Sequence, residues 1–216
     1  MKLINTYTHI LFDCDGVILD SNAVKTEAFR RVAEPFGAEC AKALVDYHLV
    51  NGGISRYRKF EWFAQRVGVR VDVASWIDSR CEAFGEYVVK SLMQAPMRDL
   101  ASLRKALPPS RWYVVSGSAQ DELRDVFQRR DLARFFDGGI YGSPRDKDQI
   151  LSELAATGDL AGPGLFLGDS RYDCEVALRH GLDFVFVHAW SEVSDWGDLC
   201  QRHAVPAIES IDELAR

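Results

Sequence analysis

His9-Ile-Leu-Phe-Asp-Cys-Asp-Gly-Val17 is the most informative stretch of this sequence. Its apolar run between polar residues is typical of a strand that is buried on both faces of a parallel sheet. Asp13 and Asp15 follow this strand directly, and Gly16 allows the chain to turn sharply there. Residues two apart on an extended strand end can direct both carboxylates into one crevice. Taken alone, the pair is explained equally well as an acidic turn that caps the next segment.

The segment after this strand is expected to be entirely helical. Breaks at glycines separate four stretches without strand-like alternation, over residues 25–36, 39–49, 55–67 and 72–93. We interpret residues 22–93 as a helical bundle that forms a cap domain inserted after the first strand. Residues 1–21 and 94–216 then form one core domain.

Strands and helices alternate again from Met97 onward. The expected strands cover residues 112–115, 139–141, 164–167 and 184–187, and the expected helices cover 98–107, 119–128, 147–156 and 173–180. A last strand and helix are expected around residues 207–215. This order predicts an α/β fold with a doubly wound parallel sheet, like the Rossmann folds. The inserted bundle would cover the carboxyl ends of the strands, where such folds bind ligands.

The composition indicates a compact globular protein. Of the 216 residues, 47% are hydrophobic and 27% are charged, which suits one or two domains. Asp and Glu number 32 against 26 Lys and Arg, so the net charge is -6 and neither nucleic acid nor a membrane is an expected partner. The five cysteines show no metal or disulfide spacing, and no secretory or membrane-spanning segment is evident, so we expect a cytoplasmic protein.

A second acidic pair follows a later strand. Asp169 and Asp173 come after the expected strand at 164–167. Because parallel strands bring their carboxyl ends to one edge, Asp13, Asp169 and Asp173 could together supply hard oxygen ligands to Mg²⁺. Without a cation, three clustered carboxylates would repel one another. The alternative is that Asp169 and Asp173 only cap the helix that follows.

Two other strand ends carry groups suited to a phosphate. Ser116-Gly117-Ser118 follows the strand at 112–115, and Lys147 lies shortly after the strand at 139–141. A hydroxyl and the free amides of a turn that opens a helix can donate to phosphoryl oxygens, and an ammonium can neutralise their charge. Alternatively, Ser116 is a plain turn residue or helix cap and Lys147 is a solvated surface lysine.

These four motifs, in this order, resemble the haloacid dehalogenase (HAD) superfamily. The similarity is to its subfamily I, in which a helical cap is inserted after the first motif, as in phosphoglycolate phosphatase and β-phosphoglucomutase. The resemblance implies a nucleophile (Asp13), a general acid/base (Asp15), phosphate-binding groups (Ser116, Gly117 and Lys147) and Mg²⁺ ligands (Asp13, Asp15, Asp169 and Asp173).

The third motif departs from a common pattern of the family. Many relatives place its lysine in a Lys-Pro-x-Pro context, whereas Lys147 follows Pro144 here. Arg145 is the alternative cation if Lys147 points away from the site.

The paired aspartates favour phosphate esters as substrates. Attack by Asp13 on phosphorus would form an aspartyl-phosphate and divide one difficult displacement into two easier ones. Asp15 can protonate the departing alkoxide and then deprotonate water. An ordinary aspartic acid has a pKa of about 3.9, so the pKa of Asp15 has to be raised if it is to act as an acid at pH 7. Cys14, between the two carboxylates, is expected to be a poorly reactive thiol.

The cap carries a cluster of cations at a helix start. Gly53, Ser55 and Arg56 are similar to the loop with which β-phosphoglucomutase holds the second phosphate of its substrate, although Gly52 replaces the lysine that precedes that loop. The alternative is a solvated helix face with Ser55 as its cap. That alternative applies most to Arg58 and Lys59.

We therefore expect an enzyme, a Mg²⁺-dependent phosphatase that acts on a small organic phosphate monoester such as a sugar phosphate or a phosphoglycolate-like compound. A phosphosugar mutase is the alternative, because it would share every core residue and differ in how well the cap excludes water. A non-enzymatic phospho-accepting or binding module is a more distant alternative. Neither the oligomeric state nor the identity of the substrate follows from the sequence.

Overall fold

The computed structural model of the chain describes residues 7–215. Its centre is a six-stranded sheet in the order β3-β2-β1-β4-β5-β6, in which every pairing is parallel. The strands are β1 (His9–Phe12), β2 (Arg111–Ala119), β3 (Gly139–Ser143), β4 (Gly164–Gly168), β5 (Asp183–Val187) and β6 (Ala207–Ile208). β1 lies between β2 and β4, with Phe12 level with Val114 and Leu167. The residue after β1 therefore lies beside the ends of two other strands.

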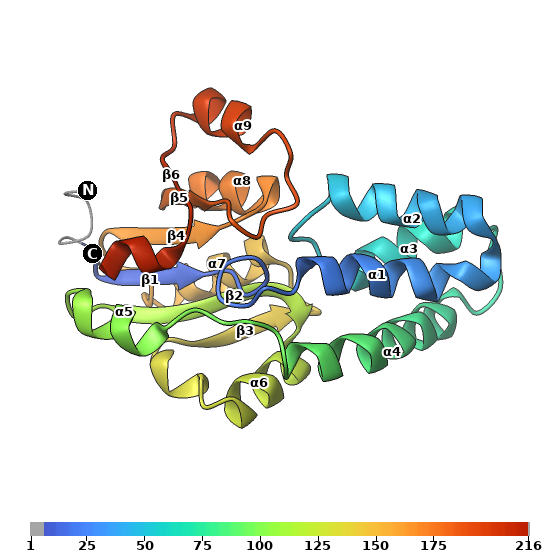
Figure 1. Cartoon of the computed structure of the whole chain (residues 1–216), viewed down its shortest axis with the longest axis horizontal. Coiled ribbons are helices and arrows are strands. Elements are labelled where there is room, and N and C mark those ends of the chain that lie inside the picture. The colour runs from blue at the N-terminus through green and yellow to red at the C-terminus, as the bar shows by residue number, and fades with distance from the viewer. Residues whose placement is uncertain (1–6, 216) are drawn as a thin grey trace.

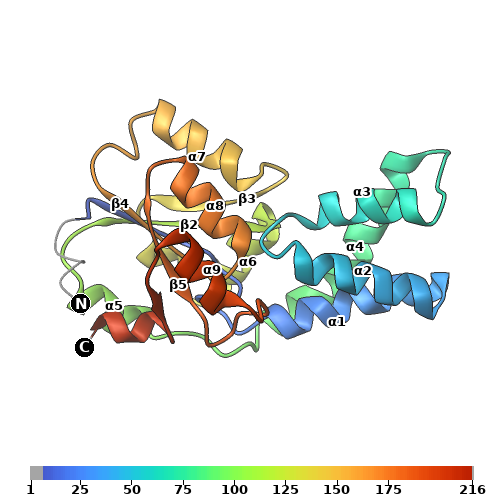
Figure 2. The same ribbon diagram turned by 90° about the horizontal axis from the view of Figure 1, so that it is seen from above.

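Helices cover both faces of the sheet (Figures 1 and 2). They are α5 (Leu100–Ala106), α6 (Gln120–Arg129), α7 (Lys147–Ala156), α8 (Arg171–Arg179) and α9 (Trp196–His203), with short 3₁₀ helices η3 (Ala133–Phe135) and η4 (Ile211–Ala215). Ile10 and Phe12 of β1 pack on the side of α5 and α6, whereas Leu11 packs on the side of α7 and α8. This alternation is what a parallel strand with two buried faces requires.

The other helices form a bundle at one end of the sheet (Figure 1). They are α1 (Asn22–Ala33), α2 (Ala38–Val50), α3 (Arg56–Arg66) and α4 (Val73–Leu92), with η2 (Glu34–Phe36) between the first two. The bundle has an aromatic interior, where the ring centroids of Phe29 lie 4.4 Å from Phe84 and 5.4 Å from Phe60. Close aromatic packing of this kind fills the interior of the bundle, and these rings belong to the same hydrophobic cluster as Phe12 of the sheet.

The chain enters and leaves the bundle through two segments that lie side by side. The amide of Asp20 donates to Pro96 O at 2.9 Å, and the amide of Arg98 donates to Ile18 O at 3.0 Å. Leu19 and Met97 form an antiparallel bridge at the same place. The two ends of the bundle are therefore tied to each other beside the sheet.

The predicted fold class is confirmed, including the parallel sheet and the helices between its strands. Three details differ from the expectation. The sequence reading missed α9, β2 runs on to Ala119, and the last helix is a short 3₁₀ turn. The division into a core (1–21 and 94–216) and a cap (22–93) stays a prediction, and residues 1–6 and 216 lie outside the described residues. None of the helices in residues 7–215 is both long and apolar enough to cross a membrane.

Candidate active site

Three aspartates meet at the carboxyl end of the sheet. Asp13 follows β1, Asp169 follows β4, and Asp173 lies in the first turn of α8. One carboxylate oxygen of each residue lies within 4.8 Å of the others, and all three residues are buried. Two parallel strands and one helix start thus bring together residues that are far apart in the sequence.

Gly16 allows the loop after β1 to pass close to this acidic cluster. It has a φ of +76°, and a Cβ at this position would lie only 2.0 Å from Asp169 Oδ2. Asn22, at the start of α1, donates to the same oxygen at 2.7 Å. Any side chain at position 16 would therefore displace the carboxylate of Asp169 as well as strain the backbone.

Lys147 supplies the positive charge of the cluster. Its Nζ lies 2.9 Å from Asp13 Oδ2 and also contacts Asp173 Oδ1, and its side chain is fully buried. Although burial disfavours the ammonium, Asp13 and Asp173 raise the pKa of Lys147. Arg145 instead donates to Gln120 at 2.8 Å and pairs with Glu153. The cation at the cluster is thus Lys147, and Lys147 is not a solvated lysine.

The cluster still carries more negative charge than Lys147 balances. Burial raises the pKa of Asp13 to about 7 in spite of the ammonium of Lys147, and Asp173 adds to the rise. Burial, with Asp13 and Asp173 nearby, also raises the pKa of Asp169 well above its ordinary value. A cation with hard oxygen ligands would relieve this repulsion. The donor set, three carboxylates with little access to water, therefore fits a divalent metal ion such as Mg²⁺.

Asp173 also takes part in capping α8. Ser170 is the N-cap residue, its hydroxyl donates to Asp173 Oδ2 at 2.7 Å, and the amide of Asp173 donates to Ser170 Oγ at 3.1 Å. Both carboxylate oxygens of Asp173 are thus held by protein groups, because Lys147 contacts the other one. Asp169 has no part in this capping box. Asp173 therefore both caps α8 and belongs to the acidic cluster. Asp169 belongs to the cluster and does not cap the helix.

Asp15 points away from the acidic cluster toward a lysine of the bundle. Lys25 contacts its Oδ2, Ser118 donates to the same oxygen at 3.0 Å, and Ser21 donates to Oδ1 at 2.5 Å. Burial favours the neutral acid, but Lys25 and these hydroxyls outweigh it and lower the pKa of Asp15. This is the reverse of the shift that a neutral acid at pH 7 requires, and the side chain of Asp15 is not among the three carboxylates of the cluster.

The segment after the second core strand is less open than expected. Ser116 is fully buried, and its hydroxyl accepts a hydrogen bond from the amide of Ser118 at 3.1 Å. The strand continues to Ala119 with an irregular register, so residues 116–118 do not form a turn that opens a helix. The amide of Ser118 is thus not free for a ligand. Gly117 faces the bundle and lines the cavity described below.

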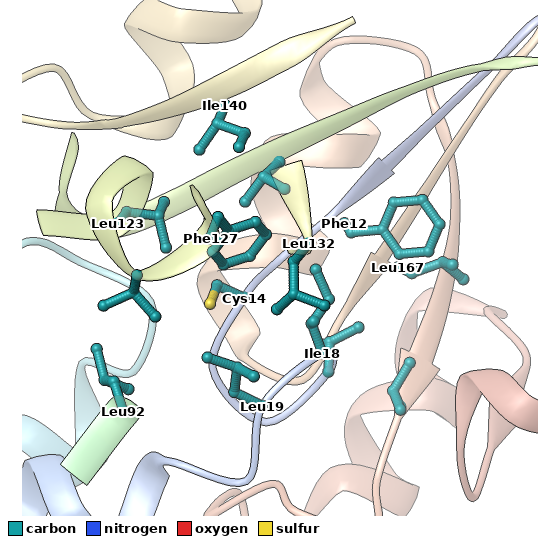
Figure 3. Close-up of a cluster of buried hydrophobic side chains, with 14 of the residues drawn as sticks. Phe12, Cys14, Ile18, Leu19, Leu92, Leu123, Phe127, Leu132, Ile140 and Leu167 are labelled. Atoms are coloured by element: carbon teal, nitrogen blue, oxygen red, sulfur yellow. The ribbon is translucent and has the colours of Figure 1, made fainter. Parts of the chain in front are cut away.

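Cys14 is buried in the hydrophobic cluster on the α5 and α6 side of the sheet. Figure 3 shows its sulfur among apolar side chains that include Phe127 and Ile18. Burial, together with the charge of Asp15, raises the pKa of the Cys14 thiol well above its ordinary value. A thiol of this kind is a weak nucleophile.

A cavity lies between the sheet edge and the bundle. Asp13, Asp15 and Asp169 line it on one side, and the bundle closes the other side with cationic and apolar residues. Gly53 and Arg56 belong to this bundle side, whereas Ser55 caps α3 by accepting from the amide of Arg58 at 3.5 Å. Of the three bundle residues predicted to bind substrate, Gly53 and Arg56 therefore line the cavity, and Ser55 is the N-cap of α3.

The cations of α3 have three different environments. Arg56 donates to Glu122 of α6 at 2.5 Å and lies over the ring of Phe84. Arg58 is exposed and 3.9 Å from Glu61, as a solvated helix face predicts. Lys59 is only 2% exposed, so the same prediction is wrong for it. The turn of α3 that carries Lys59 faces inward, and its amine lines the cavity.

A comparison with protein families identifies the family of this chain. Residues 7–181 match the family model of the haloacid dehalogenase-like hydrolases. The chain belongs to that family. This hydrolase is also 23% identical, over 85% of its length and 87% of the relative's, to the phosphorylated carbohydrates phosphatase of Thermotoga maritima. The predicted family and the expectation of an enzyme are confirmed.

Solved structures share the fold of this hydrolase over nearly the whole chain. A haloacid dehalogenase-like hydrolase from Streptococcus pneumoniae superposes with a TM-score of 0.67 at 20% identity, covering 96% of both chains. A β-phosphoglucomutase from Clostridium difficile superposes with a TM-score of 0.70 at 15% identity, covering 96% of this chain and 93% of the other. At these identities the likeness concerns the fold, including the helical bundle.

Several cavity residues of this hydrolase were missed by the sequence reading. Asn22 and Lys25 are three residues apart at the start of α1, so they lie on one helix face directly after the aspartate loop. That spacing was a usable signal, but the expected helix began at Lys25 and the pair was overlooked. His48 and Glu122 had no comparable signal, because nothing in the sequence shows which faces of α2 and α6 meet the cavity.

Replacing Gly117 with alanine is expected to hold the bundle away from the sheet edge. A Cβ at this position would lie 2.4 Å from the carbonyl oxygen of Gly53, which is backbone and cannot rotate away. A clash of this kind costs about 1–3 kcal/mol, which corresponds to a fall of about 10- to 100-fold in kcat/KM. Steady-state kinetics and small-angle scattering would measure the loss of activity and the larger radius of gyration of Gly117→Ala.

Gly197→Ala is the matched control for this change. Nothing lies within 4 Å of a Cβ at position 197, which is an exposed position in α9. This variant should keep both the activity and the radius of gyration of the wild type. Wild-type compactness in Gly117→Ala would contradict the close approach of the two glycines.

Proposed function

We propose that this hydrolase is a phosphatase that releases phosphate from a small organic phosphate monoester in a Mg²⁺-dependent reaction. The observation that carries the proposal is the buried carboxylate of Asp13, which lies beside Lys147 and the carboxylates of Asp169 and Asp173. The carboxylate of Asp15 lines the same cavity. The phosphatase name of the Thermotoga maritima relative supports the same reaction class and suggests phosphorylated carbohydrates as substrates.

Asp13 is the proposed nucleophile. Its Oδ2 is held by Lys147, and its Oδ1 accepts from the amide of Cys14 at 2.7 Å, so the carboxylate has a fixed direction at the strand end. Attack on phosphorus forms an aspartyl-phosphate as the bond to the alcohol oxygen breaks. Lys147 neutralises charge on the phosphoryl oxygens, and Ser116 and Gly117 are the proposed phosphate-binding partners after β2.

Asp15 is the proposed general acid and base. The ionised form that Lys25 and Ser118 stabilise is the form needed in the second step, when Asp15 takes a proton from the water that attacks the aspartyl-phosphate. In the first step Asp15 must carry a proton for the leaving alcohol, so Lys25 has to release it when substrate enters. Asp15 is buried between the sheet edge and the bundle, which limits the access of bulk water to this exchange.

Asp13, Asp169 and Asp173 are the proposed ligands of the metal, with Asp15 contributing from the same loop. Bound there, Mg²⁺ would supply the positive charge that lets two anions, the carboxylate of Asp13 and the phosphate, approach each other. The upward pKa shifts of Asp13 and Asp169, caused by burial and by the neighbouring carboxylates, support this assignment, because a bound cation would offset both causes.

Removing the metal is expected to stop the reaction. Phosphate release from p-nitrophenyl phosphate, a panel of sugar monophosphates and phosphoglycolate would be measured with Mg²⁺, with EDTA, and with Mg²⁺ restored. EDTA should reduce release by at least about 100-fold, and restored Mg²⁺ should recover it, because several kcal/mol of charge stabilisation are lost with the ion. Full activity in EDTA would overturn the Mg²⁺ assignment.

The same assay separates phosphatase from mutase. A phosphatase releases phosphate from monoesters without an activator. A phosphosugar mutase would require a sugar bisphosphate and would return the phosphoryl group to a sugar hydroxyl, so little inorganic phosphate would accumulate.

A further inference from the structure

The amine of Lys59 is a buried cation without a carboxylate partner. Among residues 7–215, no carboxylate oxygen lies within the 4.0 Å of an ion pair, and its hydrogen-bond partner is His48 Nδ1 at 2.6 Å. The side chain lies on the bundle side of the cavity, with Nζ 5.2 Å from the ring centroid of Phe29. An isolated ammonium in such surroundings is unfavourable unless a ligand provides the opposite charge.

His48 holds the amine in place but does not balance its charge. Its Nε2 lies 3.1 Å from the hydroxyl of Thr26, which donates in turn to Glu192 at 2.8 Å. A neutral ring with its proton on Nε2 accepts from Lys59 at Nδ1. Burial and the nearby lysines, Lys59 and Lys25, keep this ring neutral by lowering its pKa well below the ordinary value. The nearest acid of these contacts, Glu192, lies 3.7 Å from His48 Nε2, so the His48 ring separates it from Lys59.

The other cations around the cavity already have partners. Lys25 contacts Asp15, and Arg56 donates to Glu122 at 2.5 Å. Each of these pairs leaves no net charge for a ligand. Burial and Lys25 lower the pKa of Lys59 to about 7, as expected for a lysine that has no anion beside it. Lys59 is therefore the cation on the bundle side that a ligand could neutralise without first breaking an ion pair.

We propose that Lys59 recognises a second anionic group, a carboxylate or a second phosphate, on the leaving part of the substrate. The inference rests on the proposed phosphatase function, because it assumes that the phosphate to be cleaved lies at Asp13 and that the rest of the substrate extends toward the bundle. It makes Lys59 a specificity-determining residue of this hydrolase. The substrate class then becomes phosphate esters with a further negative charge, in preference to esters of neutral alcohols.

Binding of non-hydrolysable phosphonates tests this inference without relying on turnover. Isothermal titration with Mg²⁺ present would compare methylphosphonate, which has one anionic group, with phosphonoacetate, which adds a carboxylate, and ethane-1,2-diphosphonate, which adds a second phosphonate. At least one of the larger probes should bind the wild type about 10- to 100-fold more tightly than methylphosphonate, as a hydrogen bond to a charged group implies. The probe that gains identifies the anionic group.

The advantage should disappear in Lys59→Met. Methionine keeps the length and volume of the buried side chain and removes its charge, so the bundle should keep its packing. Lys59→Arg, which keeps the charge, should retain part of the advantage, and Arg58→Met, which removes an exposed neighbouring charge, should retain all of it. Absence of any gain in the wild type, or a gain that survives in Lys59→Met, would overturn the proposal.

Kinetics distinguish this failure from a failure of the phosphatase assignment. Lys59→Met should raise KM for esters with a second anionic group about 10-fold or more relative to its effect on the KM of p-nitrophenyl phosphate, because uniform binding of the second group is lost. If p-nitrophenyl phosphate is hydrolysed and neither probe depends on Lys59, the phosphatase stands and the role of Lys59 is wrong. If no ester is hydrolysed, the phosphatase assignment fails, and the titrations still decide whether Lys59 binds an anion.

Discussion

Asp13→Asn should release phosphate at least about 1000-fold more slowly than the wild type, since removing a catalytic nucleophile typically costs three or more orders of magnitude. The amide cannot attack phosphorus, and the other acids of the cluster cannot replace it. Asp173 is held by Lys147 and Ser170, and Asp169 accepts from Asn22. Phosphate release with Mg²⁺ is the measurement, with thermal unfolding to verify that the variant is folded.

Asp198→Asn is the matched control for this substitution. Asp198 is an exposed aspartate in α9, at a distance from the cluster along the chain, so this variant should behave like the wild type. Activity in Asp13→Asn above about a tenth of the wild-type value would exclude Asp13 as the nucleophile, because an unreactive amide cannot support that rate.

Lys147→Met should lose both stability and activity. It leaves Asp13 and Asp173 buried beside each other without the ammonium that contacts both. Removing one partner of a buried ion pair typically destabilises a protein by about 3–5 kcal/mol. Urea unfolding in EDTA should show a loss of this size. Phosphate release should fall by at least about 100-fold even in the folded protein, because charge on the phosphoryl oxygens is no longer balanced.

Arg145→Met tests whether the loss is specific to Lys147. Arg145 is two residues away, but it contacts Glu153 and Gln120 instead of the cluster. Surface ion pairs contribute about 0–1 kcal/mol, so this variant should unfold close to the wild type. Equal free energies of unfolding for Lys147→Met and the wild type would contradict an ionised cluster around Lys147.

The sheet edge could be predicted from the sequence because local patterns determine it. Each strand shows itself as a short apolar run, and parallel pairing forces the residues after β1 and β4 to one edge. That rule alone brought Asp13 and Asp169 together. The missed helix α9 also had a signal, since Trp196, Leu199 and Cys200 have the spacing of one apolar helix face.

The cavity could not be predicted in the same way, because it depends on how the bundle is placed on the sheet. On the sequence alone, a solvated helix face is an open alternative for Lys59, since the sequence of α3 does not show which turn faces inward. The downward pKa shift of Asp15 likewise depends on Lys25, a residue of the bundle. Contacts between the bundle and the sheet have no local sequence pattern, so they become visible only when both are placed.

The two segments that connect the bundle to the sheet lie side by side, so changes in the bundle need not alter the sheet. Because Asp20 meets Pro96 and Arg98 meets Ile18, a short connection across this point would close the core on itself with its aspartates still on the sheet edge. Helices between these points can therefore lengthen, shrink or be exchanged in evolution while the reacting carboxylates stay in register. Under the proposed division into core and cap, the substrate-binding residues of the bundle would change faster in evolution than the reacting carboxylates of the sheet edge.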